Sequence, residues 1–415
     1  MSMEENPRPM RLNSIDAARG LVMFCMIFVN DIAGASHKIV PAWLRHFKGR
    51  SGMTFVDMVF PAFLFIVGMS IPPALGGRLR AGEPLWKTLL HVVERTFSLL
   101  LIGILMVNDE SPGPSMSGIS PDLWTVLMFL CVIFTFASIS TEPPSESRRR
   151  WQWVSHVLNN AGWAGLLVLA LMFRGDKGQR IISLSPFLIH TSWYGILGLI
   201  GWAYLVGSVV YLAFRTSAVG LLGCMVLLLA LYPADKNGAF NDFWLSRYVG
   251  IGEMLGAHPS ITVAGLLLAS ILPPWGKLDL IARLRFTGWF ILGCAAAALL
   301  LNGLYGVNKN EATPSWCLWA CAFTAVIWLV FHLLSDLGSV HPVAKVFALA
   351  GRNVLLAYLL SEMLPSVFAL LGVDAWYDRA GGISLVVAIT RSAAMGVFLL
   401  AATVGLNSLG FRLKI

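Results

Sequence analysis

A histidine and an aspartate near the start of this sequence have the types and spacing of an acid–base pair. His46 lies in a short polar segment, and Asp57 follows where the next apolar run begins. A histidine titrates near neutral pH and is the usual general base for taking a proton from an attacking amine or hydroxyl. The spacing therefore favours a catalytic His46 oriented by Asp57. The alternative is an exposed loop histidine with no chemical role.

Three further polar residues lie within or at the ends of apolar runs. Asn30 ends the first run, and its amide could stabilise a developing oxyanion, a contact worth ~3 kcal/mol in the transition state. The alternative for Asn30 is a helix-ending residue that meets water. Glu362 and Arg391 lie deep in the last two runs. Ionisable groups in hydrocarbon are costly unless they pair, so we expect these two to form an ion pair with each other.

The composition identifies the kind of protein that must hold these residues. The 415 residues are 57% hydrophobic and 13% charged, whereas soluble domains are about a quarter charged. A net charge of +8 comes without a basic stripe interleaved with aromatic residues, so we expect no nucleic-acid partner. All six cysteines lie inside apolar runs, which argues against an external disulfide framework and against a cysteine-ligated metal site.

Apolar runs divide the whole chain into membrane spans. A helical span needs ~20 apolar residues, and about twelve runs (10–12) qualify. They lie near residues 17–35, 54–75, 88–107, 121–140, 152–173, 192–214, 217–233, 259–274, 286–304, 315–334, 353–371 and 383–406. The fold class predicted is an all-α polytopic membrane protein, with residues 1–415 forming one transmembrane domain in contact with membrane lipids.

The basic residues predict the orientation of these spans. Short loops such as GGRLRAG and SRRRW carry a moderate excess of arginine, which is typical of the cytoplasmic side. We therefore expect both termini in the cytoplasm and the loop of His46 on the outer side.

Four motifs, in order, resemble the heparan-alpha-glucosaminide N-acetyltransferase-like transmembrane acyltransferases, including bacterial members of the NagX type. An SxDxxRG start precedes a helix ending in asparagine, a loop histidine and a DLVFP-type helix. The other three resemble the family's EGLLxTxPS, NKNxxTPS and GxNxxLxYxxxE segments. These are GEMLGAHPS (252–260), NKNEATPS (308–315) and GRNVLLAYLLSE (351–362). In this family the loop histidine is catalytic, which adds support for His46.

The resemblance implies transfer of an acetyl group from cytoplasmic acetyl-coenzyme A, a co-substrate, to an amino sugar or glucosaminide outside. Guanidinium groups suit phosphates, so Arg11, Arg19 and Arg352 are assigned to coenzyme A, although topology alone explains them about equally well. The other residues assigned to the donor are Asn308, Asn310, Ser315 and Asn353. Those assigned to the acceptor are Asn241, Glu253 and Lys309.

Several alternatives stay open. His46 could act as a general base or as a nucleophile that carries the acetyl group, and we favour direct transfer. An amino-sugar permease is the main rival function, and an acyltransferase for lipid-linked glycans is a third. The resemblance to bacterial members predicts a multi-pass protein of the cell inner membrane. The sequence leaves a homodimer open.

Overall fold

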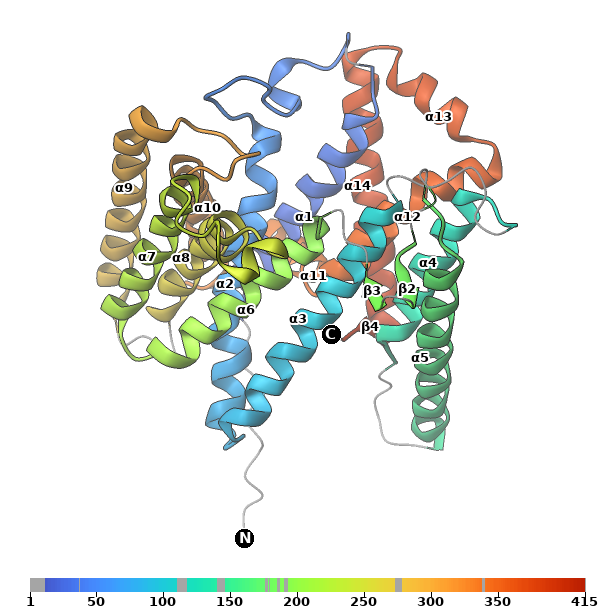
Figure 1. Ribbon diagram of the computed structural model, residues 1–415, viewed down its shortest axis with the longest axis horizontal. Coiled ribbons are helices and arrows are strands. Elements are labelled where there is room, and N and C mark those ends of the chain that lie inside the picture. The colour runs from blue at the N-terminus through green and yellow to red at the C-terminus, as the bar shows by residue number, and fades with distance from the viewer. Residues whose placement is uncertain are drawn as a thin grey trace. The chain divides into compact units, whose positions relative to one another are not determined.

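A computed structural model describes residues 12–36, 38–109, 118–139, 146–175, 178, 180–184, 187–189, 193–272, 278–337 and 340–414. Across these ranges almost all regular structure is helical, as predicted (Figure 1). The α-helices are α1 (Asn13–Ala33), α2 (Phe55–Arg80), α3 (Leu85–Asp109), α4 (Pro121–Phe136), α5 (Glu146–Met172), α6 (Gly195–Phe214), α7 (Ala218–Lys236), α8 (His258–Ser270), α9 (Leu280–Tyr305), α10 (Pro314–Ser335), α11 (Pro342–Ala350), α12 (Val354–Leu371), α13 (Asp374–Gly381) and α14 (Leu385–Ser408).

Short elements of other kinds complete the described part of the chain. Two are 3₁₀ turns, η1 (Ala42–Leu44) and η2 (Trp244–Arg247), and η3 (Ile251–Ala257) is a π-helix. The strands are β1 (Ala137–Ile139), β2 (Ile182–Leu184), β3 (Phe187–Ile189) and β4 (Phe411–Leu413). They pair antiparallel as β1 with β4 and β2 with β3.

Each of the twelve apolar runs contains a helix, and ten helical segments of the described chain are long and apolar enough to cross a membrane. The other two runs correspond to α1 and α4. Helix α4 has 16 residues and gives way to β1, so this run is shorter than the sequence indicated. Helix α1 carries Asp16, Arg19 and Asp31 within its 21 residues. The class of polytopic all-α membrane protein is confirmed, while the number twelve stays a prediction.

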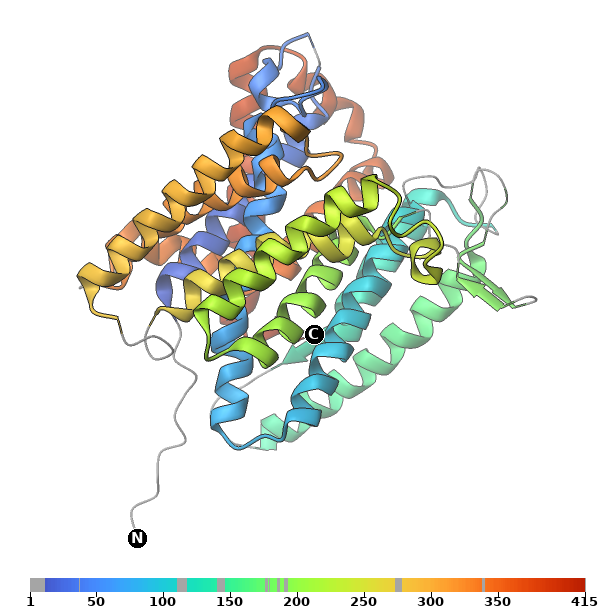
Figure 2. The same ribbon diagram turned by 60° about the vertical axis from the view of Figure 1, so that its left-hand side comes forward.

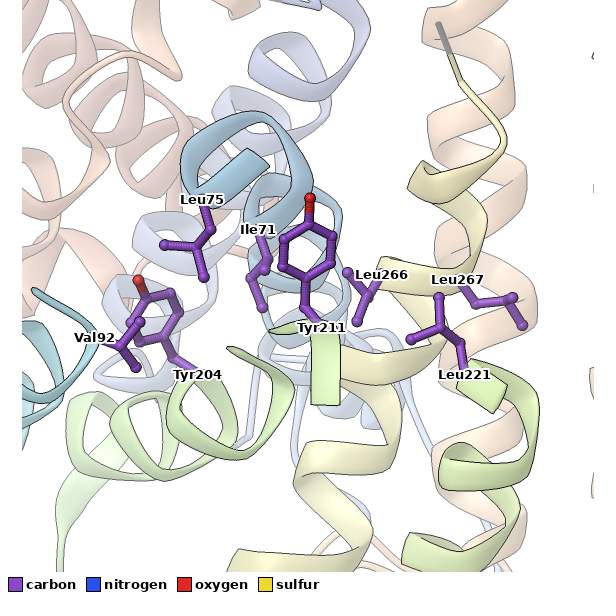
Figure 3. Packing of buried hydrophobic residues seen from close by; sticks show 8 residues of the cluster. All are labelled: Ile71, Leu75, Val92, Tyr204, Tyr211, Leu221, Leu266 and Leu267. Atoms are coloured by element: carbon purple, nitrogen blue, oxygen red, sulfur yellow. The ribbon is translucent and has the colours of Figure 1, made fainter. Parts of the chain in front are cut away.

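The chain forms two compact units. The first consists of Met1–Val22, Arg45–Thr96 and Leu199–Leu349. In it α7, α8, α9 and α10 lie side by side in both views (Figures 1 and 2), and α2 packs on α8 and α10. A buried apolar cluster joins α2, α3, α6, α7 and α8 (Figure 3). Its residues are Ile71, Leu75, Val92, Tyr204, Tyr211, Leu221, Leu266 and Leu267.

Glycines bring α2 and α8 of this unit into close contact. A Cβ atom added at Gly68 would lie 1.8 Å from the carbonyl oxygen of Thr262, and one added at Gly265 would lie 2.0 Å from that of Phe65. Small residues permit such backbone approach between membrane helices. The start of α2, where Asp57 lies, is therefore part of a rigid helix pair.

The second unit consists of Met23–Leu44, Phe97–Gly198 and Ala350–Ile415. Helix α4 packs on α5 and α12, and α12 packs on α14. The buried Asn353 precedes α12, and its Nδ2 lies 3.4 Å from the carbonyl oxygen of Phe411 in β4. This contact ties the end of the chain to the start of α12.

Candidate functional site

Asp57 lies in the first turn of α2, and its carboxylate is held by backbone donors. The side chain is 2% exposed. Its Oδ2 accepts the N–H groups of Phe47 and Thr54, each at 3.0 Å, and Thr54 forms a capping box with it. Backbone N–H groups only donate, so they favour the ionised carboxylate, which only accepts.

His46 contacts the other oxygen of this carboxylate. Its Nδ1 lies 2.8 Å from Oδ1 of Asp57. Because the carboxylate accepts, we assign the ring hydrogen to Nδ1, which leaves the lone pair on Nε2. The His46 side chain is 53% exposed. This is the geometry of a general base oriented by a buried acid. The predicted pairing of His46 with Asp57 is therefore present.

Lys309 brings a third charge to this pair. Its Nζ lies 3.3 Å from Nδ1 of His46. Burial lowers the pKa of Lys309, and the negative charge of Asp57 opposes that shift. The positive charge of Lys309 helps to balance the negative charge of the buried Asp57. This balance weakens when the amine is neutral.

Two loops far apart in sequence are joined to bring Lys309 to His46. Gly52 donates its N–H to the carbonyl oxygen of Val307 at 2.8 Å, and the N–H of Val307 donates to Oγ of Ser51 at 3.0 Å. Gly306 ends α9 with a φ of 68°, a conformation that favours glycine. The glycine turns the chain from α9 into the loop that carries Lys309.

A second acid–histidine pair lies in the same unit and is connected to Asp57 through Trp316. Glu253 is in the π-helix η3, and its Oε1 lies 4.0 Å from Nε2 of His258 at the start of α8. The ring of His258 packs edge-on against Trp316, whose Nε1 donates to the backbone oxygen of Asp57 at 3.2 Å. π-Helical segments occur often at functional sites. Trp316 thus connects the surroundings of both acid–histidine pairs.

Asn30 belongs to the second unit, near the end of α1. Its Nδ2 donates to Oε1 of Glu362 in α12 at 2.8 Å. This bond uses one of the two N–H groups of the Asn30 amide.

The predicted ion pair between Glu362 and Arg391 was wrong. Arg391 instead pairs with Asp31 at 3.1 Å, and its guanidinium lies 4.3 Å from the ring centre of Tyr377. Tyr377 donates to the same carboxylate at 2.6 Å. Because Asp31 lies one residue after Asn30, the end of α1 supplies partners for both deep ionisable groups.

The arginines assigned to the donor differ in their surroundings. Arg19 pairs with Asp16 at 2.7 Å and donates to Ser70 at 2.6 Å. Arg352 is exposed before α12. Arg11 lies outside the described residues. Arg19 is therefore held by neighbours within the protein, whereas Arg352 is exposed.

Most other residues assigned from the motifs shape the chain locally. Oδ1 of Asn308 accepts the backbone N–H of Asn310 at 2.9 Å, which makes a tight turn before α10. Ser315 is fully buried, and its Oγ has no hydrogen-bond partner in the part of the chain that the structure describes. Asn353 holds β4, as described above. Asn241 is exposed beyond α7.

Sequence reasoning missed His258 and Tyr377. His258 lies in the same motif as Glu253, but the resemblance assigned a role to Glu253 alone. Tyr377 lies in the short helix α13, between runs that were expected to be spans. Tyr377 takes its partner, Asp31, from a position 346 residues earlier, which no spacing rule predicts.

Comparisons with known proteins show which family and which relatives the sequence resembles. Residues 11–244 match a family model described as a domain of unknown function, DUF5009. The human heparan-alpha-glucosaminide N-acetyltransferase is 36% identical over 397 residues, covering 87% of this chain and 54% of the human protein. The mouse protein of the same name is 37% identical over 100 residues, covering 24% of this chain and 14% of its own. The chain spans about half the length of the human relative.

Proposed function

Because this chain belongs to the family of heparan-alpha-glucosaminide N-acetyltransferase-like membrane proteins that DUF5009 describes, we propose that it is a membrane-embedded N-acetyltransferase. The family resemblance indicated by the motifs is thereby confirmed. The proposed donor is acetyl-coenzyme A from the cytoplasm. The proposed acceptor is the amine of glucosamine or of a glucosaminide on the outer side. A place in the cell inner membrane is part of the same proposal.

The observation that carries this proposal is the bond of 2.8 Å between His46 and the buried Asp57. The amine nitrogen of the sugar would attack the carbonyl carbon of the thioester. As the C–N bond forms, Nε2 of His46 would take the amine proton. The C–S bond then breaks, and the coenzyme A thiolate leaves and takes up a proton, which His46 can return. The products are an N-acetylated sugar and a free thiol, so the scheme balances without a covalent enzyme intermediate.

The other proposed roles follow from the chemistry of each group. Lys309 supports the ionised Asp57 and stays an acceptor-site residue in this proposal. Asn30 keeps one N–H beyond its bond to Glu362, which is the requirement for an oxyanion donor. Arg11, Arg19 and Arg352 would hold the phosphates of coenzyme A.

The test is thiol release by purified protein given acetyl-coenzyme A and glucosamine, with the N-acetylated sugar measured in parallel. A general base contributes ~10²- to 10⁴-fold, so His46→Ala should lose that much turnover and still bind the donor. Lys48→Ala is the matched control, because it removes an exposed side chain from the same loop and should keep full turnover.

Two outcomes would overturn the proposal. Turnover by His46→Ala above a tenth of the original would remove His46 from the chemistry. Accumulation of labelled amino sugar in proteoliposomes, with neither thiol release nor donor binding, would favour the permease.

A further inference from the structure

A proline removes one backbone hydrogen bond from the part of α2 that carries Asp57. In an α-helix the carbonyl oxygen of each residue accepts the N–H of the residue four positions later. The residue four positions after Asp57 is Pro61, which has no N–H. The helix itself therefore offers no donor at this position to the carbonyl oxygen of Asp57.

Trp316 from α10 supplies a donor to this carbonyl oxygen instead. Its Nε1 lies 3.2 Å from the oxygen, and the contact is buried. The Trp316 side chain is fully buried, and Asp57 is 2% exposed. A buried carbonyl oxygen without a donor is costly, because no water replaces the lost bond. The indole N–H thus takes the place of the missing backbone N–H.

Aromatic packing fixes the indole in this position. The ring of His258 in α8 contacts Trp316 edge-on, with ring centres 6.2 Å apart, and contacts Phe60 of α2 edge-on at 5.3 Å. All three side chains are buried. Helices α2, α8 and α10 also pack on one another. The direction of the indole N–H is thus set by α8 and α10 and does not depend on the first turn of α2.

The carbonyl and the carboxylate of Asp57 belong to one residue, so a shift of its backbone moves both. The carboxylate accepts the N–H groups of Phe47 and Thr54, and it lies 2.8 Å from Nδ1 of His46. Such bonds need donor–acceptor distances of about 2.7 to 3.2 Å. A small displacement of the first turn of α2 would therefore weaken the hold on His46.

We propose that Trp316 is a positioning residue for His46 and Asp57. Its N–H replaces the backbone donor that Pro61 lacks, and so holds the first turn of α2 in place beside His46. Trp316 contacts neither substrate and acts through the backbone of Asp57. The inference deepens the proposed function, and its effect on turnover rests on that function. The hydrogen bond itself is tested without any substrate.

The experiment removes the indole donor and then restores a donor from the backbone. Trp316→Phe keeps an aromatic ring without the N–H, and Pro61→Ala added to it puts an N–H four residues after Asp57. Amide hydrogen exchange in peptides that contain Phe47 and Thr54, measured by mass spectrometry in detergent, reports how firmly the carboxylate is held. Exchange should be ~5- to 10-fold faster in Trp316→Phe, the effect of about one hydrogen bond. It should return toward the original rate in the double variant.

Thiol release extends the same comparison to turnover. With acetyl-coenzyme A and glucosamine, Trp316→Phe should lower kcat ~10-fold and leave both KM values unchanged, because geometry is lost and no substrate contact is removed. The double variant should regain most of that kcat, which loss of packing alone would not allow. Pro61→Ala alone should keep its kcat, because a carbonyl oxygen can accept two donors.

Trp328→Phe is the matched control for the loss of a buried indole. Trp328 lies in the same helix as Trp316 and is 1% exposed. Its Nε1 has no hydrogen-bond partner among the residues that the structure describes. The control variant should therefore change neither the exchange of the two peptides nor kcat.

The outcomes separate the positioning from the chemistry. Unchanged exchange or unchanged kcat in folded Trp316→Phe protein would overturn the proposal, and so would a loss that Pro61→Ala does not reverse. If Trp316→Phe does not fold, a folded double variant supports the proposal and an unfolded one overturns it. If the exchange pattern appears while the original protein releases no thiol, the hydrogen bond stands and the proposed acetyl transfer fails.

Discussion

The carboxylate of Asp57 holds one tautomer of His46, and an amide at that position would hold the other. Asp57→Asn is isosteric, but its Nδ2 can donate to Nδ1 of His46, which moves the ring hydrogen to Nε2 and removes the base. Turnover should fall by ~10²- to 10⁴-fold with little change in KM. The measurement is kcat and KM from thiol release, and thermal unfolding shows whether the variant is folded. A variant with more than a tenth of the original kcat would show that Asp57 does not set the tautomer.

Lys309 should lose its proton at a pH below the ordinary pKa of lysine, which is ~10.4. Burial disfavours its charged form, so its pKa is lowered and the neutral amine appears at lower pH. In Asp57→Asn the opposing negative charge is gone, and the pKa of Lys309 should fall further. Acetylation of Lys309 by trace acetic anhydride, followed across pH by mass spectrometry, gives the midpoint. A midpoint that rises in Asp57→Asn would contradict the electrostatic link between the two residues.

At the scale of residues, the sequence predicted partners that are close along the chain and failed for distant ones. His46 and Asp57 are separated by one loop and the start of a helix, so their pairing could be inferred. Lys309 reaches the ring from a position 263 residues later, through loop contacts that leave no periodic signal. Arg391 was expected to pair with Glu362. The pairing depends on which helix faces lie together, and Arg391 pairs with Asp31 instead.

Two glycines of the same helix should respond differently to the same substitution. Gly68→Ala puts a methyl group into the backbone of α8, so helices α2 and α8 must separate and the protein should lose stability. Gly77→Ala meets no atom within 4 Å and should be neutral or stabilising, since alanine is the better helix former by ~1 kcal/mol. Thermal unfolding in detergent measures both. Equal effects of the two variants would contradict the close approach of α2 and α8.

Elements with an apolar run were predictable, and those without one were not. Each run contains a helix because a helix satisfies its backbone hydrogen bonds within one segment, as hydrocarbon requires. The short helices α11 and α13 lie between runs and give no length signal. The π-helix η3 was not predicted, because Ile251–Ala257 lies before the run expected at residues 259–274.

The orientation of the whole protein can be tested with single cysteines at exposed positions of the first unit. Cysteines replacing Lys48 and Asn241 should react with an impermeant thiol reagent from outside, and cysteines replacing Lys87 and Lys345 should not. The unmodified chain gives the background, since its own cysteines lie in helices. Protection of position 48 with labelling of position 87 would invert the topology and put His46 on the cytoplasmic side.

The interleaving of the two units sets the order in which the sites can be completed during synthesis. Asn30 precedes Glu362 by 332 residues, and Asp31 precedes Arg391 by 360. At ~5 to 20 residues per second a ribosome needs roughly 20 to 70 seconds to make either partner. During this time Asn30 and Asp31 must contact water or other groups at the membrane boundary in place of their final partners. A chain interrupted before α12 would contain His46, Asp57 and Lys309 and would lack Glu362 and Arg391.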